Sequence, residues 1–524
     1  MRVKLLRVFY AAFGVLLLVL LAACCAAWTN NAAAALGVAA VLAGALWALL
    51  RRFGPAIDRL PPRRFRSLYG GLAAAYFVFL LVLGQGLAYV LVSDLGVIYE
   101  SLPELLANGR FTAYNDYYVA CTNNLGLALL LGGFYAIASL FGAAPGAAAG
   151  VYAGIAFNCA AVAAALALLG YALWLLVRRQ SAALLFLACG AALAPLWLWT
   201  PYFYSDTLCL PFLALAFAAW ARWRCRGGAG WAALCGAAIF AGGAVKGSVL
   251  VLLVAAVLGF VFAAGAAPRR ARCRAAAALL LCFALLQGGY TLFQRQFIDW
   301  TNRESTAFPT ELWLCYGSHD NGDYSQADVD ACRALPTVDA RRAMLRARIA
   351  ENYAARSPAG NAVFFLRKAV RTWGDGLYGA EEYAATPLKA SWTAAFAVPG
   401  QRWHMPLVYY AQSWQYLLLG LAAAGALLCA RRAEQRLFLP YLGLFGVMLF
   451  LSFWETKARY GLHFAPVLLL CAAGTLALLT EPGKETTGPE EAIVFRAVER
   501  LPCTADLKND DRNMFFEFAE VRRA

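Results

Sequence analysis

The chain has 524 residues, of which 62% are hydrophobic and 14% are charged, whereas soluble domains carry about 45–50% apolar and about 25% charged residues. This composition excludes a soluble globular protein and predicts a polytopic membrane protein. The net charge of +15 is divided among short clusters between apolar runs, which excludes a nucleic-acid surface and leaves membrane lipids as the generic partners of these loops.

Apolar runs of about 17–25 residues, each long enough to cross a hydrocarbon core of about 30 Å, begin near the N-terminus. The first, Val8 to Trp28, is too long for the apolar part of a signal peptide, so we expect a span. The Lys and Arg clusters lie in alternate loops, which the positive-inside rule places in the cytoplasm. The predicted spans lie at about 8–28, 32–50, 68–92, 123–141, 181–200, 208–222, 229–245, 248–266, 275–293, 405–429, 437–453 and 460–479.

The apolar stretch from Gly146 to Val177 is longer than one ordinary span, and the arginines at 178 and 179 belong inside. Two short spans in this stretch keep the alternation, which gives about 13–14 transmembrane helices in an all-α polytopic fold. The predicted division is an N-terminal hairpin with a basic loop (1–67), a transmembrane core (68–293), an external α-rich domain (294–403), C-terminal spans (404–480) and a cytoplasmic tail (481–524).

Asp94 follows the third predicted span, at the start of an external loop at about 93–122. A carboxylate at this depth can meet a lipid-embedded substrate on one side and an aqueous substrate on the other. It is a candidate general base for an acceptor hydroxyl. The alternative is a helix cap, in which Ser93 or Asp94 accepts from free backbone N–H groups of the following helix.

Two further segments carry polar residues on the same predicted face. In AYNDYYVACTNNLGL, Tyr118, Asn123 and Asn124 can hydrogen-bond sugar hydroxyls, or they can anchor the helix at the headgroup level. In WLWTPYFYSDTLCLP, a tight external turn presents Tyr204 and Asp206, and Asp206 either orients a substrate or caps the next helix.

Three cations complete the set. Lys246 lies between two apolar runs, and Lys457 and Arg459 lie in the phrase FWETKARYGLHF. A cation at a membrane span is a functional-site candidate, and its simplest role is to hold a phosphate. Alternatively, Lys246 snorkels to the interface, and Glu455 pairs with Lys457 or Arg459 rather than touching substrate.

The remaining polar features are less specific. Most cysteines lie in apolar runs, although Cys315 and Cys332 share the external domain and can pair. The histidines are scattered, so we expect no histidine-built metal site and no certain cofactor, although a divalent metal is possible. The basic run from Arg341 to Arg348 suits either an anionic acceptor or a solvated helix face.

These motifs, in this order, resemble the GT-C class of integral membrane glycosyltransferases, in particular the bacterial branch related to dolichyl-phosphate-mannose-protein mannosyltransferases. The resemblance covers about 68–475 and excludes the first hairpin. YYVACTNNLGL is similar to a Y-x-x-Y-P-N-N-x-G-L pattern and ETKARY to an E-x-R-S-R-Y pattern. The chain departs where Leu95 follows Asp94 in place of an acidic residue, and where Thr122 replaces a proline.

The resemblance implies that Asp94 is the catalytic acid of this class and that Lys457 and Arg459 lie near a donor phosphate. The function expected is inverting transfer of a sugar from a polyprenyl-phosphate donor to a cell-envelope glycan, lipid or protein. The site would face outward from a bacterial plasma membrane, since the richness in Ala, Gly and Arg hints at such a source. The alternatives are a lipid or lipid-sugar flippase, which would also use a cationic site, and a non-catalytic scaffold.

Overall fold

Helices satisfy their own backbone hydrogen bonds inside a hydrocarbon layer, so a chain of this composition is expected to be helical. The computed structural model describes residues 2–262, 267–384, 386–388 and 391–481. Within these ranges the regular structure is helical, apart from one isolated bridge between Tyr89 and Pro387. The predicted all-α, multi-pass fold is confirmed. Most of the predicted cytoplasmic tail, 482–524, lies outside the described residues.

The longer helices are α1 (Arg2–Ala27), α2 (Ala32–Asp58), α3 (Pro62–Gly86), α4 (Ser93–Asn108), α6 (Leu125–Ala138), α7 (Gly150–Val177), α8 (Gln180–Ala192), α11 (Leu210–Arg226), α12 (Ala229–Val245), α13 (Val251–Phe262), α14 (Arg269–Phe293), α18 (Val338–Ala354), α19 (Pro358–Trp373), α22 (His404–Arg432), α23 (Phe438–Phe453) and α24 (Ala465–Leu479). The short α-helices are α5 (Asn115–Ala120), α9 (Ala194–Leu198), α10 (Ser205–Leu208), α15 (Arg303–Thr306), α16 (Glu311–Tyr316), α17 (Gln326–Arg333), α20 (Ala380–Ala384) and α21 (Ala394–Ala397). Five 3-10 turns join them: η1 (Thr122–Asn124), η2 (Ser139–Phe141), η3 (Gly247–Leu250), η4 (Gln294–Gln296) and η5 (Ala458–Phe464).

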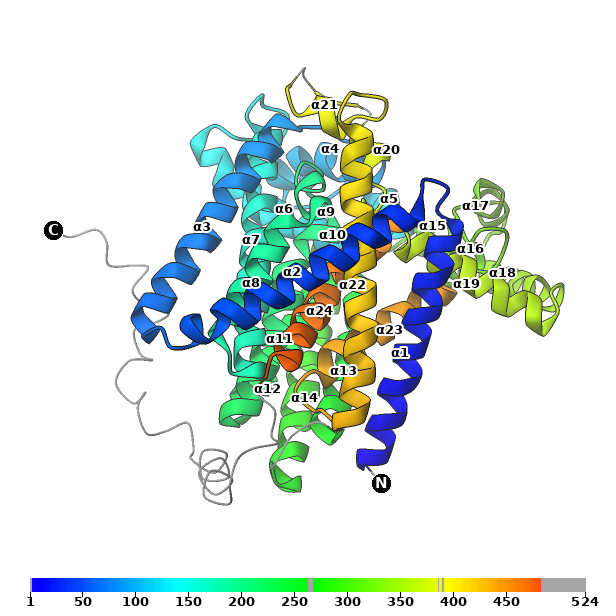
Figure 1. Cartoon of the computed structure of the whole chain (residues 1–524). Helices are drawn as coiled ribbons and strands as arrows, with labels where there is room; N and C mark the ends of the chain where they lie inside the picture. Colours follow the sequence, from blue (N-terminus) through cyan, green and yellow to red (C-terminus); the bar gives the residue numbers. More distant parts are fainter. Residues whose placement is uncertain (1, 263–266, 385, 389–390, 482–524) are drawn as a thin grey trace.

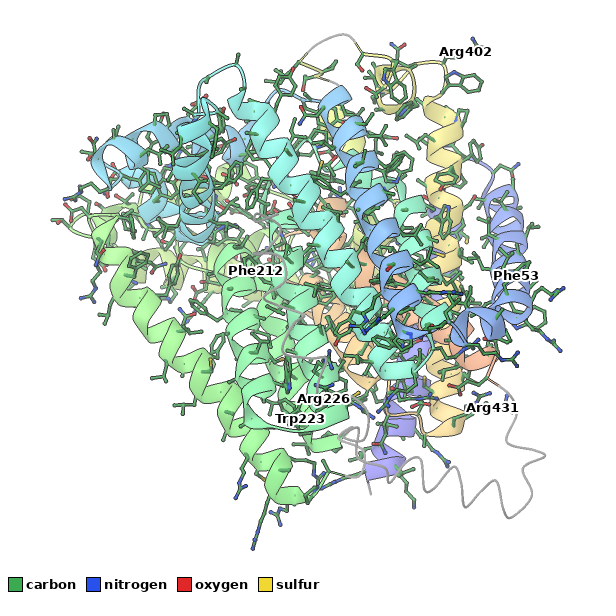
Figure 2. The ribbon with its side chains drawn as sticks, turned by 90° about the vertical axis from the view of Figure 1, so that its left-hand side faces the viewer. Phe53, Phe212, Trp223, Arg226, Arg402 and Arg431 are labelled. Atoms are coloured by element: carbon green, nitrogen blue, oxygen red, sulfur yellow. The ribbon has the colours of Figure 1, made fainter. Side chains whose placement is uncertain are left out.

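In the described part of the chain, nine helical segments are long and apolar enough to cross a membrane, and four shorter apolar helices accompany them. These thirteen apolar segments correspond to the predicted 13–14 spans, apart from α6 and α7, whose paths differ from the prediction. The two ends of the bundle can be recognised by labelled arginines. Arg226 and Arg431 lie at one end and Arg402 at the other (Figure 2). We call the first the basic end, and the opposite end, which holds α4 (Figure 1), the Asp94 end.

Helix α6 differs from its prediction as a span. At its start, a Cβ added to Gly126 would lie 1.9 Å from the carbonyl oxygen of Ala244, at the end of α12. Near its other end, the Tyr135 hydroxyl donates to the carbonyl of Gly150, where α7 begins. Both contacts are at the Asp94 end, where α4 and α6 lie together (Figure 1). The helix therefore runs along that end rather than across the bundle, although its hydropathy alone fits a span.

Helix α7 also differs from its prediction. The stretch read as two short spans forms one continuous helix from Gly150 to Val177. It ends at Arg178, whose left-handed backbone (φ 60°) turns the chain at the basic end. The two differences do not change the predicted side of Arg178. One predicted crossing is lost because α6 does not span the bundle, and a second is lost because α7 is one helix instead of two. Every later segment keeps its predicted side.

The predicted external domain forms its own small core at the Asp94 end, including Leu312, Val329 and Leu345. Arg341 is buried there and donates to backbone carbonyls of the same domain. The other three arginines of its helix form ion pairs, with Glu311, Asp339 and Asp328 as partners. Arg342, Arg346 and Arg348 are partly accessible, which fits the predicted solvated helix face, whereas Arg341 is buried and bonded within the domain. Cys315 and Cys332 are buried, free thiols in this core.

The N-terminal hairpin packs on the C-terminal part of the bundle. Helix α1 lies along α22 (Figure 1), and a Cβ added to Gly14 would lie 2.9 Å from the Leu427 side chain. The Phe13 and Tyr441 rings pack edge to face with centroids 6.4 Å apart. At the basic end, the Asp58 carboxylate of α2 accepts from Arg179, 3.0 Å away. The hairpin therefore contacts the bundle through both of its helices.

Candidate functional site

The structure brings the predicted polar segments together at the Asp94 end. They come from the start of α4, the α5–η1 segment, the turn before α11, the α12–η3 junction and η5. Tyr204 is the central side chain. Its hydroxyl is 3.1 Å from an Asp94 carboxylate oxygen, and its ring centroid is 5.4 Å from the guanidinium carbon of Arg459. A carboxylate and a guanidinium therefore both contact one buried tyrosine, the carboxylate at its hydroxyl and the guanidinium over its ring.

Asp94 is held by tyrosine hydroxyls and does not cap a helix. Helix α4 begins after Val92 without a side-chain cap. Asp94 lies in its first turn, where a negative charge interacts favourably with the helix dipole. Ser93 adopts a left-handed backbone (φ 56°), a conformation that is uncommon for a residue with a side chain. The Tyr117 hydroxyl donates to Asp94 Oδ1 at 2.9 Å, and the Tyr204 hydroxyl lies 3.1 Å from Oδ2.

Asn124 links the two tyrosines. It is buried, its amide nitrogen donates to the Tyr117 hydroxyl at 2.7 Å, and its amide oxygen lies 3.1 Å from the Tyr204 hydroxyl. Asn123 is exposed and donates to the Asn124 amide oxygen at 3.2 Å. Tyr118, the tyrosine selected from the sequence, points elsewhere: it is buried and its hydroxyl contacts Ser101 at 2.7 Å.

Arg459 is a buried cation without a carboxylate partner. Only 8% of the residue is exposed, and within the described part of the chain no acidic group lies within ion-pair distance. One terminal nitrogen donates to the Tyr383 hydroxyl at 2.6 Å, whereas Nε has no partner. The rings of Tyr204, Tyr383 and Tyr460 surround the guanidinium at 5.4–5.7 Å. Because burying a charge is costly unless it is paired, this group is suited to an anionic ligand.

Lys246 and Asp206 form an ion pair with a separation of 2.7 Å. Asp206 is 1% exposed, and its second carboxylate oxygen has no partner. Helix α10 begins without a side-chain cap, so Asp206 does not have the capping role that was its alternative. Lys246 also lies 5.2 Å from the centroid of the Tyr460 ring. The lysine is therefore held inside the cluster rather than snorkelling to the interface.

Glu455 and Lys457 lie on the other side of Tyr460. Their charged groups are 4.0 Å apart, and the Tyr460 hydroxyl donates to Glu455 at 3.0 Å. Burial raises the pKa of Glu455 above its ordinary value, and Lys457 opposes this shift. Of the two predicted partners of Glu455, Lys457 is the one within ion-pair distance. Lys457 is the most exposed of the three predicted phosphate-binding cations, with a third of its side chain accessible.

The sequence did not indicate three tyrosines of the cluster: Tyr117, Tyr383 and Tyr460. It also did not indicate the hydrogen bond of 2.8 Å between Ser248 and His463. No signal in the sequence indicated the contact of Tyr117 with Asn124, because α5 ends at Ala120 and Asn124 lies in the separate turn η1. Among the described residues, no three His, Cys, Asp or Glu side chains are grouped to hold a metal ion. A divalent metal remains an untested prediction.

The sequence was compared with known protein families and with curated proteins. Residues 65–478 match a family described as conserved hypothetical integral membrane proteins. The match covers most of the chain, so the protein belongs to this family. It begins at α3 and leaves out the α1–α2 hairpin, as the predicted resemblance did. A search of curated proteins found no match.

Proposed function

We propose that this protein is a glycosyltransferase that moves a sugar from a polyprenyl-phosphate donor to a cell-envelope acceptor. The observation that carries the proposal is the arrangement around Tyr204, whose hydroxyl contacts Asp94 and whose ring lies beside the guanidinium of Arg459, which has no carboxylate partner among the described residues. Sugar transfer needs a base on the attacking hydroxyl and positive charge on the departing phosphate. These two groups supply the two functions within one cluster.

The charges suit a single phosphate group. Lys246 is paired with Asp206, and Lys457 lies beside Glu455, which leaves Arg459 as the cation without an acidic partner in the described cluster. Its only side-chain hydrogen bond there goes to the Tyr383 hydroxyl, which a phosphate oxygen can replace. Arginine offers two parallel donors to such an oxyanion.

The proposed reaction is a direct displacement with inversion. The acceptor hydroxyl attacks the anomeric carbon and its proton passes to Asp94. The bond from the anomeric carbon to the phosphate oxygen breaks, and its electron pair leaves with the polyprenyl phosphate. Arg459 stabilises the charge that develops there. Lys246 is an additional cation at this site, since it and Arg459 both lie beside the ring of Tyr460.

The side of the membrane follows from the arginines. Arg178, Arg226 and Arg431 belong to loops at the basic end, which the positive-inside rule assigns to the cytoplasm. The Asp94 end and the external domain would then face outward. We assign the protein to a bacterial plasma membrane on its composition, with lipid-linked donor reaching the site from the outer leaflet.

The experiment is the Asp94→Asn substitution. Mass spectrometry of envelope glycans from cells with and without the gene first identifies the product, and its formation is then measured with the purified protein. Asn retains the size and one acceptor oxygen but cannot take the proton, so we expect transfer to fall by at least roughly 10²-fold. Donor binding should not change.

Asp116→Asn is the matched control, because Asp116 is an exposed carboxylate on α5. This variant should transfer at the normal rate. If Asp94→Asn turns over within a few-fold of the unmodified protein, Asp94 is not the general base. If the envelope glycans do not change without the gene and the purified protein forms no product, glycosyl transfer is refuted. A flippase, whose cationic site would need no base, would then be the better explanation, and lipid translocation in vesicles would test it.

A further inference from the structure

The two tyrosine hydroxyls that contact Asp94 differ in the number of acceptors available to their protons. A tyrosine hydroxyl has one proton to donate. The Tyr117 hydroxyl accepts from the Asn124 amide nitrogen at 2.7 Å, so its own proton is directed to Asp94 Oδ1, 2.9 Å away. Tyr117 is therefore a fixed donor to the carboxylate.

Among the described residues, the Tyr204 hydroxyl, unlike that of Tyr117, has two acceptors within hydrogen-bond distance. Its hydroxyl lies 3.1 Å from Asp94 Oδ2 and also 3.1 Å from the Asn124 amide oxygen. While Asp94 is ionised, the charged oxygen is the stronger acceptor and attracts the proton. When Asp94 is protonated, its charge is gone and the amide oxygen becomes the better acceptor. The hydroxyl can change partners by rotating about its C–O bond, without movement of any heavier atom.

We infer that Asn124 and Tyr204 are positioning residues that let Asp94 gain and lose a proton without leaving a buried hydroxyl unpaired. The inference rests on the proposed role of Asp94 as general base. In the proton-transfer step, the acceptor O–H bond breaks and its proton binds a carboxylate oxygen. The Tyr204 proton then turns to the Asn124 amide oxygen. When Asp94 releases the proton to water, the Tyr204 proton turns back, and the cycle closes.

The buried positions explain why a second acceptor is needed. Tyr204 is 5% exposed and Asn124 is 3% exposed, so water has little access to either group. A buried hydroxyl that loses its partner destabilises the state in which it is unpaired. Without Asn124, the protonated form of Asp94 would be disfavoured, and the carboxylate would be a weaker base. Asn124 thus acts on the reaction through Tyr204.

Two substitutions should have opposite effects on the proton affinity of Asp94. Tyr204→Phe removes a donor from the carboxylate, so the carboxyl group should protonate at a higher pH, by about one pH unit. Asn124→Leu removes the alternative acceptor, so Tyr204 favours the ionised form and protonation should need a lower pH. In the Tyr204→Phe background, Asn124→Leu should cause little further change. A merely structural role would not produce shifts of opposite sign.

The measurement is infrared difference spectroscopy of the purified protein during a pH titration, with Asp94→Asn as the subtraction that identifies the Asp94 band. Other groups face the network, and burial keeps one of them, Cys121, neutral by raising its pKa to about 12. The remaining facing groups are Tyr202, Asp206, Tyr383 and Arg459. Asn123→Leu is the matched control, since Asn123 is exposed and its side chain donates to the Asn124 amide oxygen without touching Asp94 or Tyr204 by a hydrogen bond in the described structure.

The infrared shifts should reappear in the acidic limb of the transfer rate plotted against pH. Shifts in the same direction for Tyr204→Phe and Asn124→Leu, or no shifts, would overturn the inference. If Asn124→Leu does not fold, Tyr117→Phe replaces it. The fixed donor should then cause a larger upward shift than Tyr204→Phe, and an equal or smaller shift would overturn the inference. Correct infrared shifts with normal transfer by Asp94→Asn would support the hydrogen-bond network and refute the role of Asp94 as general base instead.

Discussion

Removing the Arg459 guanidinium should weaken donor binding strongly. Two unit charges about 4 Å apart interact by about 4 kcal/mol at an effective dielectric constant of about 20. Since about 1.4 kcal/mol corresponds to a tenfold change in Kd, Arg459→Ala should raise the Kd of a polyprenyl phosphate by up to roughly 10³-fold. The near-complete burial of Arg459 and its lack of a carboxylate partner support the upper part of this range.

The assay is equilibrium binding of polyprenyl phosphate to purified protein in lipid nanodiscs. Arg459→Lys keeps the charge but loses the paired donors, so it should recover only part of the affinity. Lys457→Ala is the internal comparison, because this side chain is a third exposed and lies beside Glu455. We expect less than about a tenfold effect there, as for other exposed ion pairs. Unchanged binding by Arg459→Ala would refute the argument and assign the guanidinium a role within the fold.

Two further predictions concern the external domain and the path of α6. Burial lowers the pKa of Lys368 from 10.5 to about 7, so between these values the unfolded domain binds more protons and its stability should rise with pH, by at most about 1.4 kcal/mol per pH unit. Hydrogen exchange in the domain should show this rise, and Lys368→Met should abolish it; an unchanged slope would contradict the assignment. Cys introduced at Ala148, after α6, should react with an impermeant reagent from the same side as Cys at Asn108, after α4. Labelling from opposite sides would restore α6 as a crossing.

The sequence was sufficient for the membrane fold because hydropathy and basic loops report directly on insertion. It could not place α6, since a helix of this length and apolarity satisfies the same criterion whether it crosses the bundle or lies along one end. It also could not show that α7 is a single helix, because two short spans and one long helix contain the same apolar residues. The basic pair at 178–179 was the stronger constraint, and it preserved the side of every later segment.

At the site, the residues that take part were easier to predict than the partners toward which their side chains point. Among the predicted residues that lie in the cluster are Asp94, Asn124, Tyr204 and Arg459. They could be selected from the sequence because each is polar or charged and follows or precedes an apolar run. Tyr118 and Tyr117 are neighbours in sequence, yet they point to different partners because successive helical residues are about 100° apart. Tyr383 comes from a distant segment, and nothing local in the sequence indicates its contact with Arg459.

The packing of α1 on α22 has a consequence for how the protein is made. Helix α1 leaves the ribosome first, but the helix against which Gly14 packs is completed only about 400 residues later. At about 5–20 residues per second, this delay lasts roughly 20–80 s. During that interval, the face of α1 that finally contacts α22 must be covered by lipid or by an insertion factor. Helix α1 therefore cannot complete its packing until α22 has been inserted.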